Sequence, residues 1–568
     1  MKQEMLILLF FSVLIWVPLK NFAQEKSTSE SPIIDVTQLG ILANSDADQT
    51  EAIQQIFDEA KEGETIFFPQ GTYLIRTVQL RSGIHLLSDG VIQHHSSAKV
   101  GEYSMEKQNS PNPLFLGDRI ENVSISIKGR SKNEGIYLLK SHHIRIYNTE
   151  LSGDSTKLRA YSGIIAFESS EIEIANTRIR NFGSARVSSQ TYQPGTGIRI
   201  LSCNTVSIHD SEIAHNGENG IFIYGSRKVE AINNVIHHNG MSGIQVAFGD
   251  KGKEKEFNFS NNILDSNAAD AIDINNRSLE KTKDISCIIV RNISCDNGFA
   301  RGESTPDGSG IGTLINISNV LLYKNEAYRN NRPALYVESC GLILARENWA
   351  DNQVEVVSDL GNLILENNKF SSVNLIANVR ADKITLKSNE LGSLSLPNGI
   401  QVNDFQIVNN SFSHAVLNVN MKGKLLIGEN KITNDSSNPM LLIVKADEIT
   451  IEKNEIESKN SSAIILKSTA NSVKITDNKI TSLGPVIFDE NSKDLEVKQN
   501  EFSALGEGDQ GQTFRSHFPR NLVMEGNIHH GNPNSIAVQF VGKGKARLKN
   551  EKIDPGNAEY AEVEVSSN

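Results

Sequence analysis

The segments ITLKSNEL (384–391), FQIVNNSF (405–412), LLIGENKI (425–432) and ITIEKNEI (449–456) repeat one eight-residue pattern. Each reads apolar, x, apolar, x, x, Asn, x, apolar. The apolar residues alternate with a period of two, which indicates a short strand with one buried face. The Asn and the apolar residue after it indicate a sharp bend followed by a new strand.

The same pattern recurs through most of the chain. Further copies are VEAINNVI (229–236), FNFSNNIL (257–264), LILENNKF (363–370), VKITDNKI (473–480) and LEVKQNEF (495–502). Thr or Ser replaces the Asn in three earlier copies, IRIYNTEL (144–151), IEIANTRI (172–179) and VSIHDSEI (206–213). A repeat held over so many copies is typical of a solenoid. We therefore expect an all-β parallel β-helix whose bends place Asn in the left-handed region and stack it in a ladder.

A helix is predicted before the first repeat. In DADQTEAIQQIFDEAKEGE (46–64), Asp48 is a candidate N-cap and Gly63 a candidate end. The apolar residues at helical spacing are Ala52, Ile53, Ile56, Phe57 and Ala60. The next stretch, TIFFPQGTYLIRTVQL (65–80), alternates like a strand pair. Since the end of a solenoid exposes its core and an unpaired edge, we expect this helix to cap the first coil.

Residues 35–75 resemble the N-terminal segment shared by many pectate-lyase-like and polygalacturonase-like β-helix proteins. The residues that carry the resemblance are Gly40, Asp46, Asp48, Thr50, Ala52, Ile53, Gln54, Phe68, Pro69, Gly71 and Tyr73. The resemblance implies a right-handed parallel β-helix and, commonly, action on a polysaccharide. The Asp-Asp and Gly-His-Gly motifs of polygalacturonases and the Asp-Pro-His motif of alginate epimerases are missing from the sequence. No catalytic residue of those families is therefore carried over.

The N-terminus predicts export. Residues 1–24 have a Lys near the start and an apolar part over 5–19, as in a cleaved signal peptide, with a retained anchor as the alternative. We expect a linker over 25–34, the cap and first coils over 35–110, β-helix repeats over 111–550 and a tail over 551–568. The protein would then be secreted or periplasmic, with no membrane contact after cleavage.

Composition limits the partners. A net charge of -12 argues against nucleic acid, because phosphate binding needs a basic surface. An anionic sugar polymer would need only a local basic strip. The 4 Cys are too few for a disulfide framework and are expected to be small core residues.

Insertions point to the position of a site. Successive repeat Asn residues from Asn348 to Asn430 are 20 or 21 residues apart, close to a bare coil. The corresponding steps from Thr149 to Asn325 are 23 to 34 residues. Long loops that a bare coil does not need are candidates for groove walls. We therefore expect a substrate groove on the outer face of coils 149–325.

Three aligned segments supply the candidate side chains: AHNGENGIFIYG (214–225), HHNGMSGIQVAF (237–248) and DSNAADAIDINN (265–276). In each, an inward Ile starts a strand, so alternate residues point outward. The predicted substrate-binding residues, with two from the same loops, are Phe222, Tyr224, Gln245, Asn275, Arg277, Arg301, Tyr336 and Glu338.

The candidate catalytic groups are carboxylates and imidazoles. Asp270 and Asp273 would act as general acid and base in glycosidic cleavage, with His215, His237 and His238 on the turn before. A lyase or epimerase acting on a uronic acid would instead use His or Tyr to move the C5 proton. Basic side chains would then neutralise the carboxylate, and the candidates are Arg277, Lys281, Lys283 and Arg301.

Other readings stay open. No cofactor is expected, with calcium held by Asp265, Asp270 and Asp273 as an alternative. A non-catalytic β-helix that binds carbohydrate or serves as a scaffold is a rival hypothesis. A β-helix that assembles copper sites is disfavoured, because the chain has only 4 Cys and 7 Met. The oligomeric state is left open.

Overall fold

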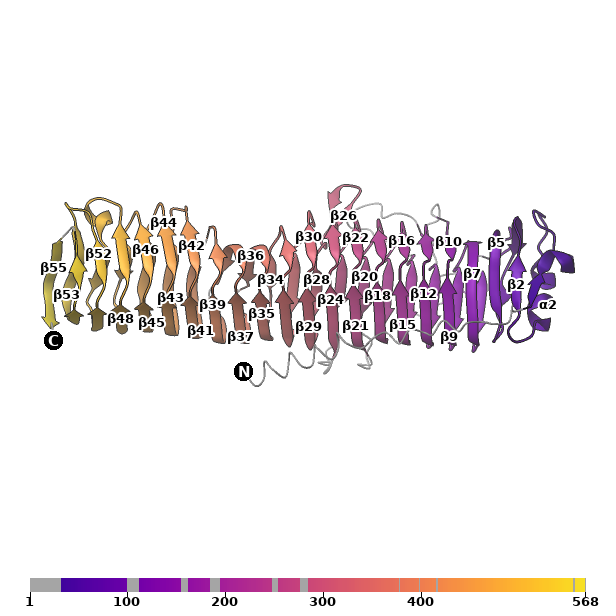
Figure 1. Ribbon diagram of the computed structural model, residues 1–568, viewed down its shortest axis with the longest axis horizontal. Helices are drawn as coiled ribbons and strands as arrows, with labels where there is room; N and C mark the ends of the chain where they lie inside the picture. The colour runs from indigo at the N-terminus through magenta and orange to yellow at the C-terminus, as the bar shows by residue number, and fades with distance from the viewer. Residues whose placement is uncertain are drawn as a thin grey trace.

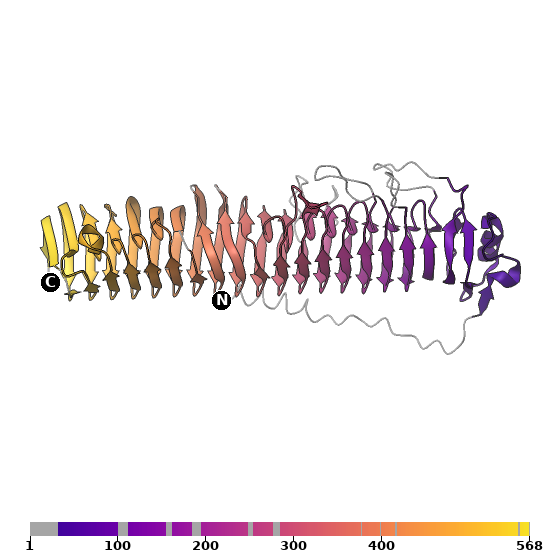
Figure 2. The same ribbon diagram turned by 90° about the horizontal axis from the view of Figure 1, so that it is seen from above.

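The computed structural model describes residues 32–99, 112–154, 162–183, 195–247, 254–275, 285–376, 378–397, 399–414, 417–554 and 557–566. These residues form one elongated column of stacked coils, with helix α2 (Thr50–Glu59) at one end and strand β55 (Asn557–Ser566) at the other (Figure 1). Turned by 90°, the coils still stack side by side at a regular spacing (Figure 2). The all-β parallel solenoid predicted from the sequence is confirmed.

Each coil of the N-terminal half adds one strand to each of three parallel sheets. The first sheet contains β4 (Val78–Gln79), β6 (Phe115–Asp118), β8 (Ile136–Leu139), β11 (Ile164–Phe167), β14 (Ile198–Leu201), β17 (Ile221–Tyr224), β20 (Ile244–Ala247), β23 (Ile272–Asn275), β28 (Gly312–Ile315), β31 (Leu335–Glu338) and β34 (Val354–Val356). The second sheet contains β7 (Glu121–Arg130), β9 (His142–Tyr147), β12 (Ser170–Ala175), β15 (Asn204–His209), β18 (Arg227–Ile232), β21 (Lys255–Ser260), β24 (Ser286–Val290), β29 (Asn319–Tyr323), β32 (Leu342–Arg346) and β35 (Leu360–Glu366). The third sheet contains β10 (Glu150–Ser152), β13 (Arg178–Arg180), β16 (Glu212–Ala214), β19 (Val235–His237), β22 (Ile263–Asp265), β25 (Ile293–Cys295), β30 (Glu326–Tyr328) and β33 (Trp349–Ala350).

In the C-terminal half several strands run from one sheet into the next without a break. The elements are β36 (Lys369–Leu375), β37 (Arg380–Lys387), β38 (Glu390–Ser395), β39 (Ile400–Val408), β40 (Ser411–Phe412), β41 (Leu417–Gly428), β42 (Lys431–Asn434), β43 (Leu441–Glu452), β44 (Glu455–Ser458), β45 (Ile464–Thr476), β46 (Lys479–Ser482), β47 (Ile487–Asp489), β48 (Asp494–Lys498), β49 (Glu501–Ala504), the 3-10 helix η2 (Gly508–Gly511), β50 (Phe514–His517), β51 (Asn521–Glu525), β52 (Ile528–His530), β53 (Ile536–Lys549), β54 (Lys552–Ile553) and β55. β55 pairs with β53, so solenoid strands continue through the segment expected to be a tail.

The N-terminal end is closed by the predicted helix. It follows β1 (Ile33–Asp35) and the 3-10 helix η1 (Val36–Leu39), and it precedes β2 (Thr65–Phe68), β3 (Thr72–Ile75) and β5 (His85–His94). Ile53, Ile56 and Phe57 are buried on the first coil, whereas Ala52, which the helical spacing placed on the same face, is exposed. Asp48 lies one residue outside the N-cap, and its carboxylate accepts from the backbone and hydroxyl of Thr50.

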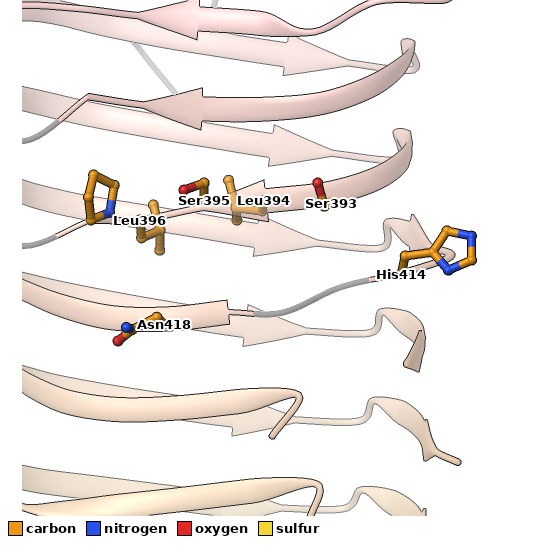
Figure 3. Close-up of a pocket in the computed structure, with 7 residues that line it drawn as sticks. Ser393, Leu394, Ser395, Leu396, His414 and Asn418 are labelled. Carbon is orange, nitrogen blue, oxygen red and sulfur yellow. The ribbon is translucent and has the colours of Figure 1, made fainter. Parts of the chain in front are cut away.

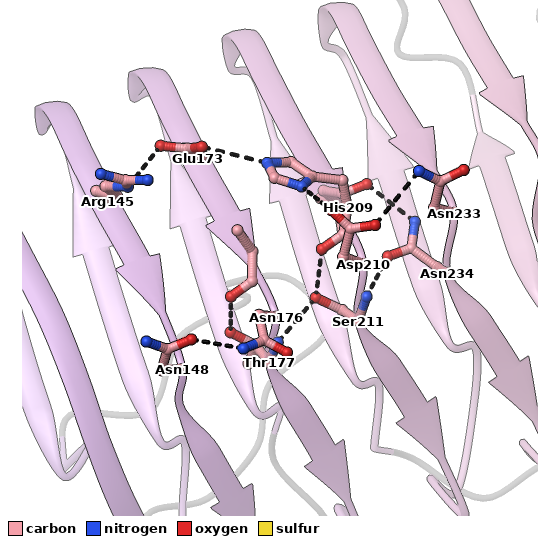
Figure 4. Close-up of polar contacts among 12 residues, drawn as sticks. Arg145, Asn148, Glu173, Asn176, Thr177, His209, Asp210, Ser211, Asn233 and Asn234 are labelled. Atoms are coloured by element: carbon pink, nitrogen blue, oxygen red, sulfur yellow. Dashed lines mark hydrogen bonds and ion pairs between the residues drawn. The ribbon is translucent and has the colours of Figure 1, made fainter. Parts of the chain in front are cut away.

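An asparagine ladder joins the coils at the bend between the second and third sheets. Each ladder Asn after the first accepts, at its side-chain oxygen, from the backbone N–H and the side-chain amide of the Asn one coil earlier. The ladder runs through Asn234, Asn262, Asn292, Asn325, Asn348, Asn368, Asn389, Asn410, Asn430, Asn454, Asn478, Asn500 and Asn527. Upstream, hydroxyls replace the amides as predicted, since Thr177 donates its N–H to Ser211 and Ser211 to Asn234 (Figure 4).

The left-handed backbone lies one residue before the ladder, not at it. Asn233, Arg291, Lys324 and Glu429, which all precede a ladder position, have φ between 53° and 58°. The expectation that the ladder Asn itself takes this conformation was wrong. Its side-chain amide instead points into the coil and forms hydrogen bonds with two or three backbone and side-chain groups. The strained left-handed conformation is taken by the exposed residue before it, which can be Asn, Arg, Lys or Glu.

A second ladder, missed in the sequence, lies at the bend between the third and first sheets. It consists of Asn216, Asn239, Asn267, Asn297 and Asn330, joined by amide hydrogen bonds of 2.9 to 3.0 Å. Glycines follow on the same bend. A Cβ at Gly197 or Gly220 would meet the carbonyl oxygen of the next coil's glycine at 2.7 Å. The Gly-Ile dipeptides that open the first-sheet strands therefore allow the coils to approach closely there.

Candidate functional site

The predicted outward residues form two rows on the outer face of the first sheet. The first row is Arg199, Phe222, Gln245, Asp273, Thr313 and Tyr336, paired strand to strand in register. The second row, two residues further along each strand, is Leu201, Tyr224, Ala247, Asn275, Ile315 and Glu338. Seven predicted residues therefore share this face: Phe222, Tyr224, Gln245, Asp273, Asn275, Tyr336 and Glu338.

Long connections join the strands of the first sheet to those of the neighbouring sheets. Those at 153–163, 181–197 and 296–311 lead from the third sheet into the first, and those at 248–254 and 276–285 lead from the first into the second. Residues 155–161, 184–194, 248–253 and 276–284, which include Arg277, Lys281 and Lys283, lie outside the described part of the chain. Within the last of the first group, β26 (Phe299–Ala300) and β27 (Glu303–Ser304) form a hairpin with exposed Arg301 at its tip.

Asp273 lies at the centre of the first row. The amide of Gln245 donates to the Asp273 carboxylate at 2.9 Å, and Asn219 donates to Gln245 at 2.9 Å. The backbone N–H of Ser242 in turn donates to Asn219. The side chain of Asp273 is 8% exposed at the sheet surface. The chain of hydrogen bonds through Gln245 and Asn219 to the backbone holds its carboxylate in one orientation.

Asp270 lies at the turn before β23 and is buried. Its carboxylate accepts from the backbone N–H groups of Gly308 (2.8 Å) and Ser309 (2.5 Å). Burial raises the pKa of Asp270 to about 6, against the lowering effect of these two hydrogen bonds. The Thr313 hydroxyl, next to Asp273 in the first row, also donates to Ser309. Asp270 thus anchors the hairpin connection to the first row.

Arg199 is a charged member of the first row that the sequence analysis did not single out. Its guanidinium pairs with Glu218 at 2.5 Å and lies over the ring of Phe222, 5.2 Å from the centroid. Thr196 donates to the same carboxylate at 2.7 Å. The sequence does contain a signal for Arg199, because this residue follows a Gly-Ile pair in TGIRIL (196–201), as Phe222 and Gln245 do in the next two coils.

The face changes from apolar to polar along the column. Tyr137, Ile165 and Leu201 are buried together on its N-terminal part, outside the core, with Phe167, Phe222 and Tyr224 packed against them. Burial raises the pKa of Tyr137 to about 12. Further along, the Tyr336 hydroxyl donates to Glu338 at 3.1 Å. Aromatic rings therefore adjoin the Gln245–Asp273 pair on the side of the lower-numbered coils.

The three histidines gather on a different sheet. His237 is the last residue of β19, and it is paired in register with Asp265 on the next coil. The ring centroids of His215, His237 and His238 are 5.0 to 5.4 Å apart, and Glu212 lies 3.6 Å from His237. Burial and the neighbouring imidazoles lower the pKa values of His215 and His237. The predicted constellation is thus split between the first sheet and the edge of the third.

The proposed calcium ligands do not converge. Among described residues, the donor groups close enough to share a cation are the three histidines and a second group of Asp265, Cys295 and Asp296. Asp270 and Asp273 belong to neither group. Cys203, Cys287 and Cys340 are buried as expected, whereas Cys295 is only half-buried and donates to Asp265.

Two hollows lie away from the first row. One of about 400 Å³ in the C-terminal coils is lined by Ser393, Leu394, Ser395, Leu396, Pro397, His414 and Asn418 (Figure 3). Its one titratable lining group, His414, pairs with Asp435 at 3.0 Å. The other, of about 100 Å³, lies where the end of β7 pairs with β10 of the third sheet. It is lined by Lys128, Arg130, Arg178 and Arg180, with Glu150 between them. It is a local basic strip on an acidic protein.

Comparison with known proteins gives a family. The sequence model of the protein family described as "Right handed beta helix region" matches residues 82–284 and 396–553. Among curated proteins, none matches the sequence. Of the described residues, no helix is long and apolar enough to cross a membrane.

Solved structures that resemble the chain are distant. The mannuronan C-5 epimerase AlgE4 A-module of Azotobacter vinelandii is 15% identical over 78% of this chain and 94% of its own, with a TM-score of 0.32. The surface adhesin PfbA of Streptococcus pneumoniae is 13% identical over 68% and 93%, with a TM-score of 0.39. A family 28 exopolygalacturonase of Yersinia enterocolitica is 14% identical over 84% and 79%, with a TM-score of 0.32. Likenesses this remote assign no activity.

Proposed function

The chain belongs to the right-handed β-helix family, and we propose that it is an exported enzyme that binds and cleaves a polysaccharide across the outer face of its first sheet. One observation carries the proposal: Phe222, Gln245 and Asp273 are paired in register on three consecutive coils. Aromatic faces, a polar amide and a fixed carboxylate in one row suit an extended sugar chain, which is apolar on its ring faces and polar at its edges.

In this proposal Asp273 is the group that touches the substrate. A carboxylate fixed by Gln245 can exchange a proton with a glycosidic oxygen or with a water, as general acid–base catalysis requires. Asp270 is a positioning residue, because its carboxylate is occupied by two backbone N–H groups. It holds Gly308, Ser309 and, through Ser309, Thr313 against the row.

A second observation favours an acidic polymer. Lys128, Arg130, Arg178 and Arg180 are exposed around the hollow where β7 pairs with β10, although the protein carries a net charge of -12. Such a strip attracts carboxylates of a uronic-acid polymer and is screened by salt. We propose that it is an additional contact for the substrate on a neighbouring face, with no metal or nucleic acid required.

The test is incubation with pectins, alginates, glycosaminoglycans and neutral glucans, following both unsaturated-product absorbance and new reducing ends. Reducing ends alone indicate a hydrolase, and both signals together a lyase. A change in uronic-acid epimer content without cleavage indicates an epimerase. Retention on a polymer without any product identifies a binding protein. No retention and no product on any acidic or neutral polymer would refute the proposal.

A further inference from the structure

The cluster of His215, His237 and His238 has no part in the proposed cleavage site. The three residues lie on the outer edge of the third sheet, two on left-handed turn positions and one at the end of β19. His215 and His238 are exposed and His237 is half-buried. The fold therefore brings three imidazoles to one accessible place from two consecutive coils.

The donor atoms are close enough to share an ion. One ring nitrogen from each residue lies within 4.8 Å of the other two, and the Nδ1 atoms of His237 and His238 are 2.9 Å apart. Zn²⁺ binds imidazole nitrogen at about 2.0–2.1 Å in tetrahedral geometry, so two nitrogen ligands of one ion are about 3.3 Å apart. Small side-chain rotations of surface residues bring all three nitrogens to that spacing.

The position of these residues on the solenoid explains why they meet. Ala214, His237 and Asp265 are paired in register on successive coils. His215 and His238 follow these strand ends on the same turn. Parallel strands stack about 4.8 Å apart, so side chains on two consecutive coils can bring ring nitrogens close enough to share one ion.

Nearby charges are mixed. Glu212 lies 3.6 Å from His237, although its carboxylate also accepts from Arg178 at 2.7 Å. Asp265 adds a negative charge from the following coil, and Arg180 a positive one from the preceding coil. The site thus offers three imidazole ligands with two carboxylates at its rim.

We propose that His215, His237 and His238 bind one divalent transition-metal ion. Imidazole ligands suit Zn²⁺, Co²⁺, Ni²⁺ and Cu²⁺ rather than Ca²⁺ or Mg²⁺. Three protein ligands leave the fourth tetrahedral position to water or an outside anion, as in open rather than structural zinc sites.

The test uses the full mature chain without a polyhistidine tag. Co²⁺ is titrated in, and the intensity of its visible absorption reports coordination number, while competition with Zn²⁺ gives the affinity for zinc. We expect one tight equivalent with the strong absorption of a four-coordinate ion. Loss of an outer-shell partner alone costs about 10–100-fold in affinity, so His215→Ala and His238→Ala should each cost at least about 100-fold.

The matched control is His530→Ala. His530 is exposed and ends β52 of the third sheet, as His237 ends β19, but it lies far along the column. Unchanged binding in this variant, with matching melting curves for all variants, supports the site. Absence of a tight equivalent in the wild type, or equal affinity in His215→Ala, His238→Ala and the wild type, would overturn it.

Discussion

Gln245 and Asp273 occupy the same position on neighbouring coils, and the amide of the first donates to the carboxylate of the second at 2.9 Å. The contact fixes a carboxylate on the outer face of the first sheet, and Phe222 lies on the other side of Gln245 in the same row. If Asp273 only stabilises the fold, its replacement leaves kcat of the folded protein unchanged. If Asp273 is catalytic, the replacement lowers kcat.

We expect Asp273→Asn to lower kcat on the polymer that the protein cleaves by about 10²–10⁴-fold, because the amide cannot exchange the proton. Retention on the immobilised polymer should persist, since the variant keeps its shape and its contact with Gln245. Initial rates and affinity electrophoresis measure the two effects separately. The matched control is Glu355→Gln, a carboxylate in the same row beyond Tyr336. A variant of Asp273 with wild-type turnover would remove it from the chemistry.

The asparagine ladder should be the most sensitive part of the fold to single substitutions. Asn410 accepts from Asn389 and donates to Asn430 and to the carbonyl of Leu386, all in the interior. Alanine there leaves several buried groups without partners, at about 1–3 kcal/mol each. We expect Asn410→Ala to raise amide exchange in the flanking coils strongly. Asn409→Gly, one residue away, exposed and at φ 56°, should leave exchange unchanged.

Acid should loosen the second coil through His94. This side chain is 1% exposed, its Nδ1 accepts from the backbone of Lys132 at 2.9 Å, and burial lowers its pKa to about 4. The unfolded chain takes up the proton near 6.5, so stability is complete above pH 6.5 and is lost as pH falls toward 4. The loss is about 3 kcal/mol.

Amide exchange of residues 85–139, corrected for intrinsic rates, measures that loss between pH 7 and 4. His94→Gln removes the titrating group and should flatten the pH dependence, whatever its effect at pH 7. The exposed His142 on β9 provides the control, because His142→Gln should leave the slope intact. The same slope in His94→Gln as in the wild type would assign the acid sensitivity elsewhere.

The capping helix should protect the first coil. Phe57 is fully buried, with its ring 6.4 Å from that of Phe115. Phe57→Ala leaves a cavity worth about 3–5 kcal/mol. We expect faster exchange in β2 and β3 and aggregation on mild heating, as the first strands lose their cover. Gln55→Ala, on the exposed side of the same helix, should behave as the wild type.

Most of the fold could be predicted from the sequence, because the repeat keeps a recognisable period along the chain. ITLKSNEL and its copies placed the strands, the bend and the first ladder, and TIFFPQGTYLI placed the first coil. The second ladder was overlooked, because Asn216 and Asn239 sit in Asn-Gly turns that look like ordinary turn chemistry.

The candidate site was predicted only where alternation applied. Phe222, Gln245, Asp273 and Tyr336 follow from counting along strands, and the structure places them in one row. Asp270 lies in a turn, where no period fixes the side chain, and its carboxylate is directed at backbone 38 and 39 residues later in the chain. Contacts of that range depend on how an insertion folds, which the local sequence does not encode.

The ladder has a consequence for how such a chain changes over generations. Its rungs are separated by as few as 20 residues and as many as 33, yet each rung meets the next with the same two hydrogen bonds. Each coil therefore returns to the same register with the coil before it, whatever the length of its loops. An insertion or deletion between two ladder Asn residues changes one surface loop and leaves the register of all later coils unchanged, so its cost is limited to closing a loop of different length.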